Sequence, residues 1–264
     1  MSQWRTWTAL AVTGMLSIAG PAAAAGCQAH SLPHRVSVLE LYTSEGCSSC
    51  PPADRWLSGL PQHGIDGTMV IPLAFHVDYW NQLGWPDRFS QARFSDRQRQ
   101  ISHRLKSDVI YTPQLVLDGR DLRLIGGMDQ LQKTLSAANR QPSAAEIEVR
   151  VEPAAQALAI AAQVLVPDTT LRAHSEAWIA VFENGLSSRV ARGENAGKQL
   201  YHDFVVRELV GPFPLDSDGR AQPKHVLRPA ADWNLSNMGV AVLVQRNDNG
   251  QFLQATQAPL ACRS

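Results

Sequence analysis

The sequence lacks a net charge, because its 24 lysine and arginine residues balance 24 aspartate and glutamate residues. Such a balance argues against nucleic acid as a partner and gives no reason to expect attraction to a membrane surface. Beyond its N-terminal segment the chain also lacks repeats, low-complexity tracts and any apolar run of the roughly 20 residues that a spanning helix needs. We therefore expect no nucleic-acid partner and no membrane span in the rest of the chain.

The N-terminal segment has the layout of a secretory signal peptide. Arg5 precedes a mostly apolar stretch, Gly20 and Pro21 interrupt that stretch, and small residues follow. This pattern predicts a signal peptide over residues 1–25 and a secreted or periplasmic mature protein. A membrane anchor is the weaker alternative because the apolar run is short. Lipidation at Cys27 is also weak, since the large aliphatic residue expected three positions earlier is missing.

Cysteine is scarce, with four residues in the chain. Cys47 and Cys50 are local partners, whereas Cys27 and Cys262 lie near the two ends of the mature chain. Export permits disulfides, and four cysteines allow three pairings. Chain termini often lie close together, so we expect a structural disulfide between Cys27 and Cys262. Two unpaired cysteines or an intermolecular bond stay open as alternatives.

The local pair lies in the stretch TSEGCSSCPPADRW, residues 43–56. The preceding segment, residues 34–42, is apolar on both faces, as is typical of a strand inside a sheet. Two prolines after Cys50 are tolerated only in the first turn of a helix, so a helix should begin near Cys50. Cys47 would then be an exposed sulfur at the positive N-terminal end of that helix, where the thiolate form is favoured.

Further strands and helices are predicted in the N-terminal half. Residues 67–80 contain a second apolar strand, in which Pro72 suggests an edge position. Residues 90–105 have helical spacing, and the Asp-Gly pair at 118–119 between two apolar runs is a strong hairpin signal. A closing helix is expected over residues 128–138, where leucines recur four positions apart.

This order of strand, helix, strand, helix, hairpin and helix, with C-x-x-C opening the first helix, resembles the thioredoxin fold over about residues 34–140. The resemblance implies an α/β thioredoxin-like domain at residues 26–140 with a helical insertion near residues 84–108. It also implies a cis peptide bond before Pro113, which would pack beside the two sulfurs. The backbone of Thr112 would pair with an extended substrate segment.

Three stretches are more closely similar to a family of bacterial secreted proteins catalogued as domain of unknown function 1223. The similarity runs through most of the mature chain and implies a fold and export, but the family brings no established substrate. The stretches are LELYTSEGCSSCPPADRW, HVDYWNQLGW and YTPQLVLDGR.

One departure from thioredoxins concerns the buried acid that they carry on the first strand. That acid would align with Leu41, whereas Glu40 lies one residue earlier and on the opposite face. Glu40 is a candidate proton shuttle by another route. The alternative is a carboxylate paired with an arginine at the sheet edge.

Four polar and aromatic residues follow the second predicted strand, namely His76, Asp78, Tyr79 and Trp80. Side-chain alternation puts His76, Asp78 and Trp80 on one face, at the edge that carries the C-x-x-C turn. The functional interpretation is a substrate rim, in which His76 carries protons and the aromatic rings contact the substrate. The structural alternative is a histidine–aspartate hydrogen bond beside core aromatics.

The character of the sequence changes after a polar linker at residues 137–145. Alternation in EIEVRVE, an Asp-Asn-Gly turn at residues 248–250 and several short strands predict an antiparallel all-β sandwich domain at residues 141–264. His202 and Asp203 adjoin a glycine-bearing loop and are interpreted as structural.

The leading functional hypothesis is a thiol–disulfide oxidoreductase that acts on protein or peptide thiols without a bound cofactor. Cys47 would attack a substrate disulfide and Cys50 would resolve the mixed disulfide. A first alternative is a copper or other soft-metal protein with Cys47, Cys50 and His76 as ligands. A second alternative is a binding or scaffold module in which the C-x-x-C forms a non-reactive disulfide.

Overall fold

The computed structural model describes residues 26–123 and 127–262, so the predicted signal peptide at residues 1–25 lies outside the described residues. The strands are β1 (Cys27–His30), β2 (Ser37–Thr43), β3 (Val70–His76), β4 (Gln114–Leu117), β5 (Arg120–Asp121), β6 (Glu146–Ala154), β7 (Ala157–Leu165), β8 (Ser175–Glu183), β9 (Leu186–Arg189), β10 (Gln199–His202), β11 (Val205–Pro214), β12 (Arg220–Ala221), β13 (Lys224–Leu227), β14 (Met238–Arg246) and β15 (Phe252–Pro259). The helices are α1 (Pro51–Ser58), α2 (Ala92–Arg104), α3 (Gly127–Ala138) and α4 (Thr169–Arg172), with 3-10 turns η1 (Leu60–His63), η2 (Asn81–Leu83) and η3 (Leu235–Asn237).

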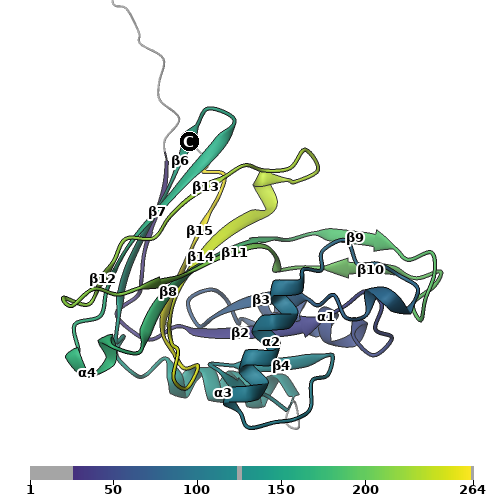
Figure 1. Cartoon of the computed structure of the whole chain (residues 1–264), viewed down its shortest axis with the longest axis horizontal. Coiled ribbons are helices and arrows are strands. Elements are labelled where there is room, and N and C mark those ends of the chain that lie inside the picture. Colours follow the sequence, from purple (N-terminus) through teal and green to yellow (C-terminus); the bar gives the residue numbers. More distant parts are fainter. Residues whose placement is uncertain (1–25, 124–126, 263–264) are drawn as a thin grey trace, which may run out of the picture.

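The largest sheet runs in the order β15-β14-β8-β11-β3-β2-β4-β5 and takes strands from both halves of the chain (Figure 1). Strand β3 pairs in parallel with β2 and with β11, and the other pairs are antiparallel. Because side chains alternate along β2, Leu39 and Leu41 pack on one face with Leu57 of α1. Tyr42 packs on the other face with Phe94 of α2. The strand is therefore buried from both sides.

This topology contradicts the expected fold class, an α/β thioredoxin-like domain followed by a separate all-β sandwich domain. The overturning contact joins β11 to β3, where Val205 pairs with Ala74 and the N–H of Ala74 donates to the carbonyl of Phe204 at 2.8 Å. Strands of the second half thus extend the sheet that contains β2. An exposed, apolar strand edge would invite pairing with other chains, and β11 occupies that edge of β3 at Ala74.

Pro72 was expected at a sheet edge, but it lies in a strand with neighbours on both sides. On one side it is opposite Leu39 of β2. On the other side β11 pairs with β3 at Val205 and Ala74, two residues further along. Proline has no N–H to donate to a ladder. Pro72 is tolerated in β3 because β11 pairs with this strand at Ala74 and not at Pro72.

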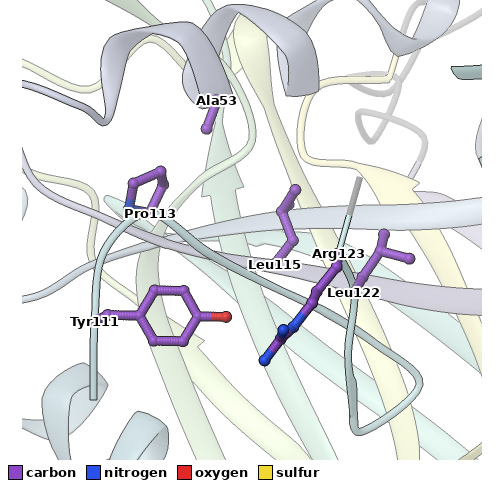
Figure 2. Close-up of a pocket in the computed structure, with 6 residues that line it drawn as sticks. All are labelled: Ala53, Tyr111, Pro113, Leu115, Leu122 and Arg123. Atoms are coloured by element: carbon purple, nitrogen blue, oxygen red, sulfur yellow. The ribbon is translucent and has the colours of Figure 1, made fainter. Parts of the chain in front are cut away.

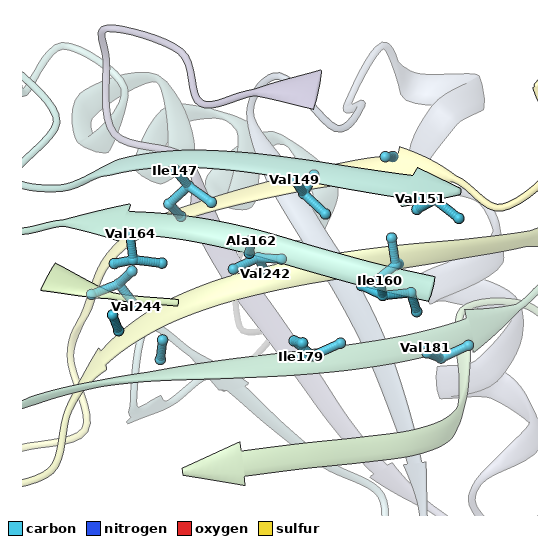
Figure 3. Close-up of a cluster of buried hydrophobic side chains, with 14 of the residues drawn as sticks. Ile147, Val149, Val151, Ile160, Ala162, Val164, Ile179, Val181, Val242 and Val244 are labelled. Carbon is cyan, nitrogen blue, oxygen red and sulfur yellow. The ribbon is translucent and has the colours of Figure 1, made fainter. Parts of the chain in front are cut away.

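A second sheet runs in the order β1-β6-β7-β12, with β13 also paired to β7. Figure 3 shows its apolar side chains facing those of β8 and β14 across a shared core. Ile147, Val149 and Val151 of β6 are buried while the residues between them are not, which confirms the period-two pattern of this segment. The sandwich-like packing thus exists, but one of its two layers is the large sheet itself.

Several local elements agree with the sequence-based expectations. Helix α1 begins at Pro51, directly after Cys50. Strands β4 and β5 are joined at Asp118 and Gly119, whose φ angles of 48° and 78° match the residue types that tolerate a left-handed backbone. Helices α2 and α3 occupy the two segments predicted to be helical.

Candidate functional site

The Cys47–Cys50 disulfide closes the loop that leads from β2 into α1. The Cα atoms of the two cysteines are 5.4 Å apart. The N–H of Cys47 donates to the carbonyl of Ser44 at 3.1 Å, and the N–H of Cys50 donates to the carbonyl of Cys47 at 3.2 Å. Cys50 is the N-cap of α1. The disulfide therefore lies at a helix N-terminus, where unpaired N–H groups favour negative charge.

Both cysteines of this disulfide are buried. Cys47 and Cys50 each have 0% exposure, whereas Ser48 and Ser49 between them are exposed. Cys47 was expected to be exposed, because a loop residue at a helix N-terminus is ordinarily accessible to solvent. The structure differs because residues from the second half of the chain cover the loop.

The cover is the connection between β9 and β10, residues 190–198, called here the cover loop. Asn195 of this loop is fully buried and donates from Nδ2 to the carbonyls of Glu45 and Cys47, at 2.9 Å each. The neighbouring Glu194 accepts at Oε2 from the N–H of Ser48 at 3.0 Å. These hydrogen bonds fix the C-x-x-C loop to residues that come almost 150 positions later in the chain.

Replacing Asn195 with alanine is expected to make the Cys47–Cys50 disulfide more reactive. The change leaves two buried carbonyls without their donor, at about 1–3 kcal/mol for each unpaired group, and opening of the cover loop relieves that penalty. We expect dithiothreitol to reduce the disulfide about tenfold faster or more, since roughly 1.4 kcal/mol corresponds to a factor of ten in rate. Quenched alkylation followed by mass spectrometry measures the rate.

The matched control is Asn139→Ala. Asn139 also donates from Nδ2 to two carbonyls, those of Thr68 and Met69 just before β3, at 3.1 Å and 3.4 Å. This variant loses the same chemical group at a site outside the cover loop. If both variants are reduced at the rate of the wild type, the cover loop does not control access to the disulfide.

Trp80 connects the C-x-x-C loop to the segment before β4. Its Nε1 donates to Oγ1 of Thr112 at 2.8 Å. A side chain at Gly46 would come within 3.2 Å of the Cβ of Trp80, so glycine allows the loop and the indole to approach closely. The peptide bond between Thr112 and Pro113 is cis. Trp80 thus lies between the residue before Cys47 and the residue before Pro113.

An open cavity of 420 Å³ lies beside α1 and Pro113. Figure 2 shows Ala53 of α1 and Pro113 on one side of it, with Tyr111 and Arg123 on the other. Its lining is mostly apolar, with one cationic group and one phenol. The remaining lining residues are Leu115 and Leu122.

Five buried titratable side chains gather behind the C-x-x-C loop, namely Glu45, Asp54, His76, Asp87 and His202. Nδ1 of His76 lies 2.6 Å from Oδ2 of Asp87. Nε2 of His202 is 3.4 Å from Oε1 of Glu45, and Nδ1 of His202 is 3.7 Å from Oδ2 of Asp54. The two imidazole rings are 5.0 Å apart and nearly perpendicular. We call these five residues the buried cluster.

Burial and pairing move the pKa values of the buried cluster in different directions. Burial raises the pKa of Asp54, and His202 only partly opposes it. Burial also acts to raise the pKa values of Glu45 and Asp87, but the nearby histidines, His202 for Glu45 and His76 for Asp87, oppose it together with hydrogen bonds from other groups, and both pKa values are lowered. Burial acts to lower the pKa of His76, but Asp87 outweighs it and raises that pKa. Asp54 is therefore the one carboxyl group of the buried cluster whose pKa is raised.

The four predicted rim residues do not share one environment. His76 belongs to the buried cluster, and its carboxylate partner is Asp87 rather than Asp78. Asp78 instead accepts from the hydroxyl of Ser95, and the hydroxyl of Tyr79 donates to Gln98, both on α2. Trp80 donates to Thr112, before Pro113.

Glu40 lies on the α2 face of β2. Its Oε1 accepts from Nε of Arg97 at 2.7 Å and from the hydroxyl of Tyr42 at 3.2 Å. The adjacent Leu39 and Leu41 point to the α1 face. Glu40 thus has an arginine partner in the sheet interior, on the face opposite to the helix that follows the disulfide.

The second disulfide joins Cys27, the first residue of β1, to Cys262. Their Cα atoms are 5.5 Å apart. The two ends of the described chain are therefore covalently tied together.

Sequence reasoning missed three residues that surround the C-x-x-C loop. Asp54 had a detectable signal, because a residue four positions after Cys50 lies on the same face of a helix. His202 was interpreted as structural, and Asn195 was not noticed. Neither carried a local signal, since both reach the loop only through the β9–β10 hairpin.

The described residues contain no group of three histidine, cysteine, aspartate or glutamate side chains arranged to hold a metal ion. The sulfurs of Cys47 and Cys50 are bonded to each other and offer no thiolate in this state. Nδ1 of His76 is engaged by Asp87. Among the helices of the described part, none has both the length and the apolar character to cross a membrane.

Residues 38–245 match the family described as "Protein of unknown function (DUF1223)", and the chain belongs to this family. A structural-genomics crystal structure of a protein from Agrobacterium tumefaciens is similar, with 24% identity and a TM-score of 0.63 over 87% of this chain and 97% of that chain. HBP35 of Porphyromonas gingivalis is 16% identical, with a TM-score of 0.67 over 87% of this chain and 76% of that chain. Both similarities are similarities of fold. No curated protein matches the chain.

Proposed function

We propose that the protein is a thiol–disulfide oxidoreductase whose redox pair is Cys47 and Cys50. The observation that carries the proposal is a C-x-x-C disulfide at the N-terminus of α1 with the buried cluster behind it. Burial of ionisable groups costs free energy, and such groups concentrate at functional sites. A disulfide that only closes a loop does not require buried ionisable groups beside it.

The chemistry is exchange between this disulfide and thiols of proteins or peptides. A substrate thiolate attacks the Cys47 sulfur, the Cys47–Cys50 bond breaks, and its electron pair leaves on the Cys50 sulfur. A second substrate thiolate then attacks the substrate sulfur of the mixed disulfide and releases Cys47. The substrate loses two electrons and the cysteine pair gains them. The reverse sequence reduces a substrate disulfide.

Two further observations support this proposal. The cavity beside Ala53 and Pro113 offers an apolar surface next to the helix that carries the redox pair. The chain also contains two disulfides, and disulfides persist in oxidising compartments. We propose a secreted or periplasmic location on that ground.

The test is the replacement of Cys47 with serine. We expect this variant to lose catalysis of the dithiothreitol-driven reduction of a model peptide disulfide, because the Cys47 sulfur that forms the mixed disulfide is missing. The double variant Cys27→Ala/Cys262→Ala is the control and is expected to keep the activity, since it alters only the distant disulfide. Unchanged turnover in Cys47→Ser would refute the proposed function.

One observation favours a second candidate function, a binding or scaffold module with a non-reactive disulfide. Both cysteines of the C-x-x-C are fully buried. In that case the folded protein would resist reduction by dithiothreitol, and Asn195→Ala would not change this. An oxidoreductase requires that the disulfide react while the protein is folded.

A further inference from the structure

The buried cluster contains more polar atoms than hydrogen-bond partners. Within the described residues, Oε1 of Glu45, Nε2 of His76 and both ring nitrogens of His202 are buried without a hydrogen bond. Each unpaired buried polar group costs about 1–3 kcal/mol. A purely structural polar core would normally satisfy these atoms. Atoms without fixed partners are instead available to accept or release a proton.

Asp54 connects the buried cluster to the disulfide. It follows Cys50 by one helical turn, its N–H donates to the carbonyl of Cys50 at 3.1 Å, and both residues are buried. Residues four positions apart lie on the same helix face. Oδ1 of Asp54 accepts from the hydroxyl of Thr43 at 2.8 Å, while Oδ2 lies 3.7 Å from Nδ1 of His202. Asp54 therefore lies one helical turn from Cys50 and beside the imidazole of His202.

Strand β10 brings His202 to this place by packing against α1. Nε2 of His202 lies 3.4 Å from Oε1 of Glu45, which precedes Cys47 by two residues. One imidazole thus lies between two carboxyl groups, one from the residue two positions before Cys47 and one from the residue four positions after Cys50. Imidazole is the side-chain group whose ordinary pKa is closest to neutral pH, so it is suited to transferring protons between such groups.

The charges around Asp54 and His202 suit this transfer. Burial raises the pKa of Asp54, whereas the pKa values of Glu45 and Asp87 are lowered. Asp54 is therefore shifted toward its protonated form, whereas its two carboxyl neighbours are shifted toward their charged forms. Several groups face Asp54 and His202. The direct neighbours are Thr43 of β2, Glu45 of the C-x-x-C loop, His76 of β3, and Asp87 and Phe89 before α2. Two arginines, Arg88 and Arg207, lie over the ring of Phe89.

We propose that Asp54 and His202 form a proton relay for Cys50, taking its proton when the disulfide forms and returning it when the disulfide opens. The proposal rests on the proposed oxidoreductase function and names the residues that move the proton. Asp54 exchanges the proton with the Cys50 sulfur. His202 accepts it from Asp54 and passes it on.

The step balances for reduced protein and a disulfide substrate. The Cys47 thiolate attacks one substrate sulfur, which forms a mixed disulfide and releases the first substrate thiolate. Asp54 then takes the proton of the Cys50 thiol, and the Cys50 sulfur attacks the Cys47 sulfur and expels the second substrate thiolate. Two electrons pass from the cysteine pair to the substrate. The proton leaves Asp54 through His202 for solvent, where the thiolates are protonated.

The experiment follows the mixed disulfide directly. Reduced protein is mixed with oxidised glutathione, acid-quenched and analysed by mass spectrometry at several pH values. In Asp54→Asn and His202→Gln we expect the mixed disulfide at Cys47 to form but to resolve about 10²-fold more slowly at pH 7, the size typical of acid–base assistance. The difference should shrink above the ordinary thiol pKa of about 8.5, because solvent then deprotonates Cys50.

The matched control is Asp118→Asn, at the opposite end of β2. Asp118 is partly buried, burial raises its pKa, and its carboxylate accepts from the N–H of Val38. This variant should resolve the mixed disulfide like the wild type. Slow resolution at every pH in the relay variants would indicate a structural role and overturn the relay.

The remaining outcomes separate the relay from the function on which it rests. If the wild type resolves the mixed disulfide and the relay variants match it at all pH values, the relay is wrong and the oxidoreductase function stands. If the wild type never forms the mixed disulfide, the function fails and the relay fails with it. If Asp54→Asn does not fold, His202→Gln carries the test.

Discussion

Replacing Arg97 with methionine is expected to lower the free energy of unfolding by about 3–5 kcal/mol, the usual cost of removing one partner of a buried ion pair. Nε of Arg97 lies 2.7 Å from Oε1 of Glu40, and the two side chains are 5% and 0% exposed. The variant leaves the Glu40 carboxylate in the sheet interior without a countercharge. Urea denaturation followed by circular dichroism measures the change.

The contacts of Arg97 explain why its replacement should destabilise the whole sheet. Nη2 of Arg97 donates to Oε1 of Gln245 on β14 at 3.1 Å. The guanidinium also lies over the rings of Phe75 and Trp178, at 5.7 Å and 5.4 Å from their centres. The side chain thus joins α2 to strands from both halves of the chain. We expect one cooperative transition at lower urea rather than separate melting of α2.

The matched control is Arg99→Met on the same helix. Arg99 pairs with Asp96 on the surface, with about half of each side chain exposed, and exposed pairs contribute about 0–1 kcal/mol. The double variant Glu40→Leu/Arg97→Met should lose less stability than Arg97→Met, because it leaves no unpaired buried charge. Equal losses in Arg97→Met and Arg99→Met would contradict the prediction.

Removing the Cys27–Cys262 disulfide by replacing both cysteines with alanine is expected to lower the free energy of unfolding by up to about 5 kcal/mol. The bond joins residues separated by 235 positions. Cutting so long a loop gives the unfolded chain much more conformational freedom. The folded state should change little, because β1 stays paired with β6 from Cys27 to His30. Urea denaturation of oxidised protein measures the difference.

The second disulfide provides the comparison. Cys47→Ala/Cys50→Ala removes a bond between residues only three positions apart, so loop-closure entropy predicts a smaller loss. Fully reduced wild type should lose about the sum of the two. If removal of the local disulfide costs as much as removal of the terminal one, loop closure is not what the terminal disulfide contributes.

The elements that sequence predicted well are those fixed by local rules. The prolines after Cys50 can occupy only a first helical turn, so α1 begins where they are. The Asp-Gly pair at 118–119 forms the turn between β4 and β5 because few other residue types tolerate its backbone angles. The apolar segment of β2 is buried on both faces, as its composition indicates.

The division into an α/β domain and a separate sandwich was wrong for a physical reason. A strand pattern indicates that a segment pairs with neighbouring strands, but it does not identify those strands. Strand β11 could have stayed with the strands of its own half, and the pattern of VVREL is compatible with either choice. Only the assembled sheet places it between β8 and β3.

The candidate site also has a part that could be predicted from the sequence and a part that could not. That Cys47 and Cys50 lie directly before the start of a helix could be predicted from local rules, because three-residue spacing and proline sterics act over a single turn. The burial of both cysteines, the contact of Asn195 with the Cys47 carbonyl and the position of His202 beside Glu45 could not be predicted in this way. Those residues are far away in the chain, and their position follows from strand pairing and packing of the whole sheet. No local pattern encodes such contacts.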